Sequence, residues 1–365
     1  MPIEFSTDRR RTREEKKNSR RRILYIQARN LGDAVVGTGL IEALGRSDSD
    51  LGISVLTRPE FREIYENSPL VSEVFYASFP MGTAKNFNFS TGLKLARTIA
   101  TLRRMRFDQV VHVSGDFREN LLGWAISPST NTGVAWENGH PQAKMVQRGC
   151  EGYVPNLIRV AADEHSVYSA VQRVASALKA AAPARSRLYD ASGEPYAHRP
   201  GGDQLGIQPT ASQECKLWPP ERWRELIAII RASGLRVAVF GAPADRSYLE
   251  ACLPSVDDPG VEIFTGSLAS FFRNLQGVRA LVGLDSFGIH AAHAIGTPTI
   301  MLYGANIPTV WTPPGTLTVS NSAPPSCYPC MNQPTCTRED HPYSCIREIP
   351  VAAITGKMQK LGVMR

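Results

Sequence analysis

The sequence contains no long apolar run. No stretch approaches the roughly 18 residues that a membrane-spanning helix needs. The N-terminus is basic but lacks the apolar core of a secretory signal, and the strongly apolar segment at residues 23–26 has only the length of a strand. These absences argue against a helical membrane protein and predict a cytoplasmic one.

Net charge is also scarce outside the first residues. The 365 residues include 41 Lys and Arg against 34 Asp and Glu, which gives a net charge of +7. Residues 1–22 account for +5 of it, so the remaining 343 residues carry only +2. Because no basic stripe continues into this body, no nucleic-acid partner is expected. The basic tail 1–22 is predicted to be disordered and is interpreted either as a solubilising extension or as a contact with an anionic membrane surface.

A disulfide framework is not expected either, because the cytosol keeps thiols reduced. Four of the seven cysteines nevertheless cluster near the C-terminus as Cys327-x2-Cys330-x5-Cys336-x8-Cys345, with His341 in the last spacer. This spacing is typical of a structural metal site. Four thiolates would close a tetrahedron round zinc or iron and leave no position for catalysis. The alternative is a group of free or redox-active thiols without metal.

Short apolar runs alternate with amphipathic stretches, over a length that suffices for two domains. Strands are predicted at residues 23–28, 53–57, 109–113, 205–208, 235–240, 280–284 and 299–303. Helices are predicted after Asp33 and at residues 93–105, 220–231 and 286–295. Such alternation produces parallel sheets covered by helices.

The alternation breaks once, at residues 182–204, which are rich in Pro, Gly and polar residues. We therefore predict an α/β protein with two doubly wound, Rossmann-like domains that face each other across a cleft. The predicted domains span residues 23–185 and 205–350, with a linker at 186–204 and a C-terminal helix at 351–365. In open parallel sheets, ligands bind beyond the carboxyl ends of the strands, so the functional residues are expected just after strands.

The segment ARNLGDAVVGTG at residues 28–39 follows the first predicted strand and opens a helix. Gly32 permits a tight turn, and Asp33 at the helix start is either an N-cap or a reactive carboxylate. A dinucleotide-binding turn is a weaker alternative. Glu42 occupies the third glycine position, and Arg58 follows the second strand where an acid would bind a ribose.

Two segments of the second half carry anion-binding signals. Lys216 is the only cation in the polar loop after that half's first strand, where it is either solvated or placed to neutralise a phosphate. Later, Asp285 and Ser286 end a strand and start a helix, whose unpaired N–H groups and positive dipole end favour an anion. His290 and His293 share one face of that helix, but they are only half of a tetrahedral metal site.

Together these motifs resemble glycosyltransferase family 9, the ADP-heptose:lipopolysaccharide heptosyltransferases. The resemblance spans about residues 22–355 and rests on five segments in the family's order: ILYIQARNLGDAVVGTGLIEAL, FDQVVHVSGDFRENLLGWA, CKLWPPERWREL, DSFGIHAAHAIGTPTIMLYG and CYPC…C…CIREI. It implies a GT-B fold and an inverting transfer of heptose from ADP-heptose to a saccharide, lipopolysaccharide core or a related glycan, without a catalytic cofactor. The N-terminal domain would bind the acceptor and the C-terminal domain the nucleotide sugar.

The resemblance also assigns roles. Asp33 would be the general base that deprotonates the acceptor hydroxyl, and Lys216 would contact the donor's phosphates or sugar. The other residues implied for donor binding are Thr210, Asp285, Ser286, Phe287, Gly288 and His290. Phe287 departs from the family, which has a small glycine there, and Asp245 would replace a glutamate that binds the ribose.

Acceptor-side residues are sought after strands of the first domain. Arg58, Asp116 and Arg118 hold such positions, and arginines suit an anionic, phosphorylated saccharide; solvated surface residues are the alternative. The acceptor would be lipid-linked if it is found at the inner membrane, which the basic tail would contact. Three other functions stay open: heptose transfer to a protein, a sugar-nucleotide epimerase on the same scaffold, and a non-catalytic module that binds a sugar nucleotide or a metal.

Overall fold

The computed structural model describes residues 21–79, 88–127, 129–137, 151–161, 166–199, 202–330, 336 and 340–364. It divides into two compact units, Met1–Pro195 and Tyr196–Arg365, at a point inside the predicted linker. Residues 1–20 of the predicted tail lie outside the described part of the chain. Arg21 and Arg22 differ from that prediction, because they begin strand β1 (Arg21–Gln27), where the Arg22 N–H donates to Asp108 Oδ2 at 2.6 Å.

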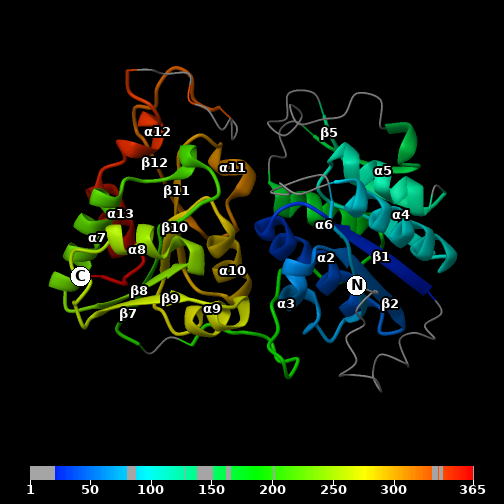
Figure 1. The fold of residues 1–365 in the computed structure, drawn as a ribbon, viewed down its shortest axis with the longest axis horizontal. Helices are drawn as coiled ribbons and strands as arrows, with labels where there is room; N and C mark the ends of the chain where they lie inside the picture. The colour runs from blue at the N-terminus through cyan, green and yellow to red at the C-terminus, as the bar shows by residue number, and fades with distance from the viewer. Residues whose placement is uncertain are drawn as a thin grey trace. The chain divides into compact units, whose positions relative to one another are not determined.

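The N-terminal unit is built on one parallel sheet of six strands in the order β3-β2-β1-β4-β5-β6 (Figure 1). Besides β1, the strands are β2 (Leu51–Thr57), β3 (Val71–Tyr76), β4 (Gln109–Val111), β5 (Asn131–Trp136) and β6 (Asn156–Val160). Every residue of β2 is buried, as expected for a parallel sheet that is covered on both faces.

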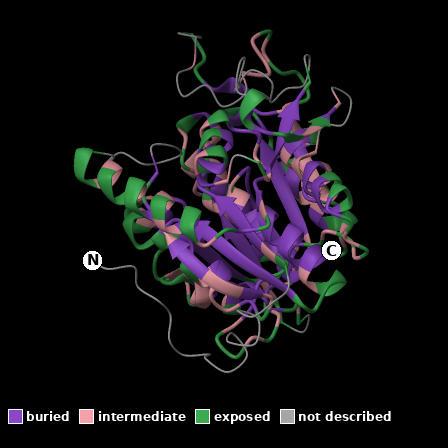
Figure 2. Cartoon of the chain, turned by 90° about the vertical axis from the view of Figure 1, so that its right-hand side faces the viewer, coloured by how far each residue is buried: buried purple, intermediate pink, exposed green. Residues whose placement is uncertain are grey.

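The helices of this unit are α2 (Leu31–Ser47), α3 (Arg62–Tyr65), α4 (Phe89–Arg104), α5 (Phe117–Ile126) and α6 (Val167–Ala177), with short 3-10 turns η1 (Pro59–Phe61) and η3 (Glu151–Tyr153). Helices α4 and α5 share one buried cluster with the sheet, because Leu102, Leu122 and Ile126 pack with Leu24 and Ile26 of β1. Figure 2 shows the buried strands in purple and the outward faces of the helices in green.

The C-terminal unit repeats this plan, with parallel strands in the order β12-β11-β10-β7-β8-β9. The strands are β7 (Gln204–Gln208), β8 (Arg236–Gly241), β9 (Val261–Thr265), β10 (Leu281–Leu284), β11 (Thr299–Tyr303) and β12 (Leu317–Ser320). The helices are α7 (Pro220–Ala232), α8 (Arg246–Ala251), α9 (Leu268–Leu275), α10 (Phe287–Ile295), α11 (Pro308–Trp311), α12 (Ser344–Arg347) and α13 (Val351–Lys360), with turns η4 (Glu214–Lys216) and η5 (Pro243–Asp245).

The strand order fixes where each unit can bind a ligand. Counted from its own first strand, each sheet has the doubly wound order 3-2-1-4-5-6, so the direction of winding reverses between β1 and β4 and between β7 and β10. Ligands bind at such a switch point, beyond the carboxyl ends of the strands. The predicted α/β class with two Rossmann-like folds is confirmed. None of the described helices is long and apolar enough to cross a bilayer.

Candidate active site

The Gly-Asp turn joins β1 to α2. Asn30 is the N-cap of α2, and its N–H donates to Asp33 Oδ2 at 3.3 Å in a capping box. This contact holds the half-buried Asp33 carboxylate on the first turn of the helix, at the carboxyl edge of the sheet. Capping engages one of the two carboxylate oxygens, so a capping role and a chemical role are compatible.

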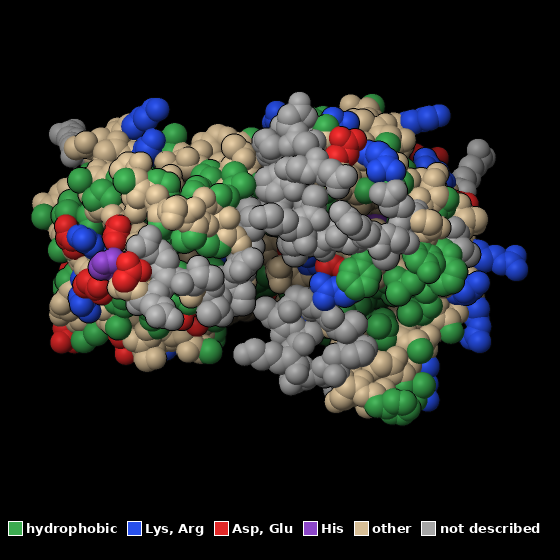
Figure 3. Space-filling model, turned by 90° about the horizontal axis from the view of Figure 1, so that it is seen from above, with side chains coloured by type: hydrophobic (Ala, Val, Ile, Leu, Met, Phe, Trp, Pro, Cys, Tyr) green, Lys and Arg blue, Asp and Glu red, His purple; other side chains and the backbone are tan. Residues whose placement is uncertain are grey.

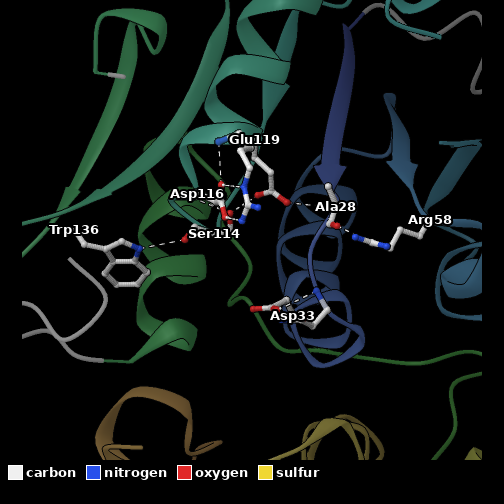
Figure 4. Close-up of polar contacts among 9 residues, drawn as sticks. Ala28, Asp33, Arg58, Ser114, Asp116, Glu119 and Trp136 are labelled. Carbon is white, nitrogen blue, oxygen red and sulfur yellow. Dashed lines mark hydrogen bonds and ion pairs between the residues drawn. The ribbon is translucent and has the colours of Figure 1, made fainter. Parts of the chain in front are cut away.

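The end of β1 is held from two sides (Figure 4). The Ala28 N–H donates to Glu119 Oε1 at 2.9 Å, and the Ala28 carbonyl accepts from Arg58 Nε at 2.8 Å. Arg58 is buried, and its Nη1 lies 3.6 Å from Glu60 Oε1. The sequence predicted Arg58 for acceptor binding. In the structure, its side chain stabilises the start of the Gly-Asp turn through this hydrogen bond to Ala28.

Glu119 was missed by the sequence analysis. It lies in the first turn of α5, is fully buried, and also accepts a hydrogen bond from the Ser114 hydroxyl. Burial raises the pKa of Glu119 to about 7, against the opposing effect of hydrogen bonds from Ser114 and Ala28 and of the Arg29 charge. A group that changes charge near neutrality thus ties the β4–α5 loop to the Gly-Asp turn.

Asp116 and Arg118 form a close pair at the start of α5. Asp116 Oδ1 accepts from the Arg118 backbone N–H and from Arg118 Nε, both at 2.9 Å, and Oδ2 accepts from Nη2 at 2.6 Å. Burial alone would raise the pKa of Asp116, but hydrogen bonds and charge from Arg118 outweigh it, so the pKa lies below its usual value. The Arg118 side chain is 36% exposed and reaches solvent. Trp136 Nε1 donates to the Ser114 carbonyl at 3.2 Å, which fixes the same loop.

In the C-terminal unit, Lys216 and Asp285 form an ion pair. Lys216 Nζ lies 3.0 Å from Asp285 Oδ2 and donates to the Asp285 carbonyl at 3.1 Å. The side-chain amide of Asn306, which follows β11, donates to the same carboxylate oxygen. Lys216 follows β7 and Asp285 follows β10, so the structure brings the two residues together at the switch point of this sheet.

The N-terminus of α10 lies beside this pair. Ser286 is the N-cap, but its side chain does not cap the helix; its hydroxyl donates to Gln208 Oε1 at 2.8 Å. Gln208 Nε2 in turn donates to the Thr210 carbonyl at 3.3 Å. A Cβ on Gly288 would lie 2.3 Å from Gln208 Oε1, so this position needs glycine for Gln208 to approach. Backbone N–H groups of the first turn therefore remain available for an anion.

Phe287 packs against aromatic residues of α9. Its ring centroid lies 5.3 Å from that of Phe271 and 6.0 Å from that of Phe272, so its bulk stabilises the start of α10 from the apolar side.

His290 is buried and His293 is half-buried. Within the described ranges, no group of three or more His, Cys, Asp or Glu side chains is placed to hold a metal ion.

The geometry of each unit can be compared with known proteins. Residues 95–340, about two thirds of the chain, match the family model described as glycosyltransferase family 9 (heptosyltransferase). The chain belongs to glycosyltransferase family 9. Among curated relatives, lipopolysaccharide heptosyltransferase 1 of Pseudomonas aeruginosa is 24% identical over 319 residues, which cover 87% of each chain.

Solved structures of glycosyltransferases share the fold. The family 9 glycosyltransferase of Veillonella parvula has a TM-score of 0.68 at 14% identity, over 94% of this chain and 98% of that one. Escherichia coli heptosyltransferase WaaC with ADP-2-deoxy-2-fluoro heptose has a TM-score of 0.65 at 16% identity, over 93% and 99%. The iron-containing dodecameric glycosyltransferase TibC of enterotoxigenic E. coli has a TM-score of 0.56 at 17% identity, over 94% and 76%. Family membership makes the protein a glycosyltransferase and sets aside the epimerase and binding-module alternatives.

Several polar residues of this family 9 site were not among the predicted ones. Besides Glu119, they are Ser114, Gln208 and Asn306, which hold the Gly-Asp turn, the α10 N-cap and Asp285. Two of them could have been found from their place at the carboxyl ends of strands, because Gln208 ends β7 and Asn306 comes three residues after β11. Asp245, expected near a ribose, lies after β8 and accepts from the Ala242 N–H at 3.1 Å.

The cysteine-rich segment packs beside the donor-side residues of the same unit. The Tyr328 hydroxyl donates to the Asn306 carbonyl at 3.0 Å, and the Tyr343 N–H donates to Cys336 Sγ at 3.4 Å. Gly304 lies closely packed between this segment and the turn that contains Lys216, because a Cβ on Gly304 would lie 2.6 Å from the Cys215 carbonyl oxygen and 2.8 Å from Ile346 Cβ. The segment thus supports the turn that presents Lys216.

The four clustered thiols influence one another but do not converge on a ligand geometry. Burial raises the pKa of Cys345 to about 11, with smaller contributions from Cys330, Cys336 and Cys327. Burial, followed by Cys327, raises the pKa of Cys330 as well. The described positions of these thiols do not form a metal-binding group.

Proposed function

We propose that this family 9 glycosyltransferase transfers heptose from ADP-heptose to a saccharide acceptor, lipopolysaccharide core or a related glycan, with inversion at the anomeric carbon. The observation that carries the proposal is the Lys216–Asp285 pair beside the uncapped N-terminus of α10. A cation and free helix N–H groups are what a bound diphosphate requires. The similarities to lipopolysaccharide heptosyltransferase 1 and to WaaC with an ADP-heptose analogue support the donor.

The C-terminal unit would bind the donor. Lys216 and the first-turn N–H groups of α10 would hold the diphosphate and stabilise the negative charge that grows on it as ADP leaves. Asp285 orients the Lys216 ammonium, and Gln208 fixes Ser286 at the helix start. The remaining residues assigned to the donor are Phe287, Gly288 and His290, which belong to α10, and Thr210, whose carbonyl accepts from Gln208 Nε2.

The N-terminal unit would activate the acceptor. The Asp33 carboxylate takes the proton of the acceptor hydroxyl as its oxygen attacks the anomeric carbon. The bond from that carbon to the diphosphate breaks, and the electron pair leaves with ADP. Arg118, paired to Asp116 yet reaching solvent, is the proposed contact to an anionic acceptor. Arg58 would act by holding the Ala28 carbonyl and thereby the Gly-Asp turn.

Turnover with ADP-heptose and a panel of acceptors tests this function. We expect release of ADP and a saccharide product heavier by one heptose. Turnover only with another nucleotide sugar would refute the donor, and a heptosylated protein as the sole product would replace the saccharide acceptor by a protein. Boiled enzyme with each donor gives the rate of uncatalysed hydrolysis as the control.

We further infer that Cys327, Cys330, Cys336 and Cys345 hold a structural zinc or iron ion. Their mutual influence and the similarity to iron-containing TibC support this inference, whereas their described positions do not form a metal-binding group. Such an ion would stiffen the segment behind Lys216 and take no part in the reaction. Metal analysis tests the inference: stoichiometric metal lost in Cys330→Ser supports it, and metal-free protein refutes it.

We also propose a cytoplasmic location with peripheral contact to the inner membrane through residues 1–20, the part of the predicted basic tail that precedes β1. The clustered cations of the tail support this, because each Lys or Arg near an anionic surface contributes about 1 kcal/mol. Deletion of residues 1–20 should weaken membrane association and leave turnover of a soluble acceptor unchanged. Unchanged membrane association would refute the role of the tail.

A further inference from the structure

Exposed apolar side chains gather on one part of the N-terminal unit. Eight large apolar side chains are exposed in the described part of the chain, and six of them lie on α4, α5 and the turn η3. The six are Phe89, Leu93, Phe117, Leu121, Trp124 and Tyr153. Phe89 is 90% exposed. The other two, Ile229 and Val256, are isolated in the C-terminal unit, as single exposed apolar residues commonly are.

The residues on α4 and α5 form one surface, which we call the α4–α5 stripe: Phe89, Leu93, Phe117, Leu121 and Trp124. Spacings of four and three residues place them on one face of each helix. Both helices pack on the same face of the sheet through their opposite sides, so the two exposed faces point outward together.

One contact joins α4 to α5, and a second joins α5 to the turn η3. Arg103 Nη1 of α4 donates to the Ala125 carbonyl of α5 at 3.2 Å. The Trp124 ring packs edge to face on Tyr153, with centroids 5.1 Å apart. Figure 3 shows hydrophobic side chains gathered next to Lys and Arg on the N-terminal unit.

The exposed charges of α4 and of the two residues that follow it are all positive, and the acids Asp116 and Glu119 at the start of α5 are buried. Residues 89–106 contain five cations and no acid, and the five, Lys94, Arg97, Arg103, Arg104 and Arg106, are exposed. Arg97 lies one turn after Leu93 on the same side of α4, and Arg104 lies two turns further along that side. A second copy of the chain would present the same charges and be repelled, whereas an anionic surface would be attracted. Tryptophan and tyrosine beside basic residues are typical of the membrane interface.

The stripe is continuous with the candidate acceptor residues. Phe117 lies between Asp116 and Arg118, at the end of α5 that meets the carboxyl edge of the sheet. An acceptor anchored in a bilayer would reach Arg118 with the least displacement if the stripe lay on that bilayer.

We propose that the α4–α5 stripe docks the N-terminal unit on the surface of an anionic lipid bilayer. Its apolar side chains enter the boundary between headgroups and acyl chains, and the neighbouring arginines contact lipid phosphates. The docking surface is separate from the basic tail. The proposal rests on the proposed function in one respect: docking brings the enzyme to its acceptor only if that acceptor is anchored in the membrane.

Cosedimentation of the full chain with lipid vesicles tests the proposal. The wild type should bind phosphatidylcholine vesicles that contain phosphatidylglycerol, and not vesicles of phosphatidylcholine alone. Leu121→Asp combined with Trp124→Asp should lower the partition coefficient at least about tenfold. The matched control, Ile229→Asp with Val256→Asp, alters two exposed apolar residues of the C-terminal unit and should bind like the wild type.

Three outcomes would overturn the proposal. The first is that the Leu121→Asp/Trp124→Asp variant binds vesicles as well as the wild type does. The second is that deletion of residues 1–20 abolishes vesicle binding entirely. The third is that the wild type binds no vesicles but self-associates, and that the variant does not self-associate. Circular dichroism and the melting temperature report whether the variant is folded. Turnover of a soluble acceptor by the variant should equal that of the wild type, so a failure of docking is distinguishable from a failure of the proposed reaction.

Discussion

Replacing Glu119 by glutamine tests whether the buried carboxyl at the end of β1 changes charge near neutral pH. Glutamine has the same shape, an oxygen for the Ala28 N–H that now donates at 2.9 Å, and an amide that can face Ser114. Burial raises the pKa of Glu119 from 4.5 to about 7. One pKa unit corresponds to about 1.4 kcal/mol, so ionisation in the folded state costs about 3 kcal/mol more than in the unfolded chain.

The sign of the pH dependence follows from proton binding. Between pH 4.5 and 7, the folded state binds more protons at Glu119 than the unfolded chain does, so the free energy of unfolding falls as the pH rises. The wild type should lose about 3 kcal/mol from this group over that window. Glu119→Gln cannot ionise, so it should match the wild type at the acid end and exceed it by up to about 3 kcal/mol above neutrality.

Urea unfolding at a series of pH values measures this difference. Circular dichroism and tryptophan fluorescence should be followed together, because two units need not unfold as one. Asp50→Asn, at an exposed acid of the same unit, is the matched control and should run parallel to the wild type. Parallel curves for Glu119→Gln and the wild type would refute the assigned ionisation.

Three other substitutions have expected outcomes. Lys216→Met keeps most of the length of the side chain, removes its charge and leaves Asp285 without its cationic partner. We expect kcat/KM to fall at least about 10²-fold and ADP binding, measured by calorimetry, to weaken. Unaltered ADP affinity would contradict this expectation. Gly288→Ala places a Cβ 2.3 Å from Gln208 Oε1. We expect the free energy of unfolding, measured in urea, to fall by about 1–3 kcal/mol and KM for the donor to rise. An unchanged unfolding midpoint would show that Gln208 moves aside freely. Arg58→Ala removes the 2.8 Å hydrogen bond to the Ala28 carbonyl. We expect the free energy of unfolding to fall by about 1–3 kcal/mol and kcat to fall, with the affinity for the donor unchanged. Weakened donor binding would contradict the proposal that Arg58 acts by holding the Gly-Asp turn.

The central strands could be predicted from the sequence, and the edge strands could not. All seven predicted strands are present, and they lie in or next to the middle of the two sheets. Four of the five that were missed, β3, β6, β9 and β12, are the edges. Edge strands mix exposed polar residues into the apolar run. The fifth, β5, begins with Asn131, which is buried because its amide donates to two backbone carbonyls.

The candidate site divides in a similar way. Charged residues directly after strands, such as Lys216 and Asp285, could be selected by type and position, and the strand order places them together. The neutral amides Gln208 and Asn306 look like ordinary surface residues in a sequence. Glu119 looks like an acid that stabilises a helix N-terminus. Its contact with Ala28 joins residues 91 positions apart, which no local pattern reveals.

The general-base role of Asp33 is the central claim, and turnover by Asp33→Asn tests it most directly. Asparagine keeps an oxygen that can accept the Asn30 N–H, so the helix cap survives while the base is lost. With ADP-heptose and a soluble acceptor, kcat should fall at least about 10²-fold, and ADP affinity and melting temperature should stay at the wild-type values. A kcat equal to that of the Asp50→Asn control would contradict the account and leave Asp33 as a helix cap alone.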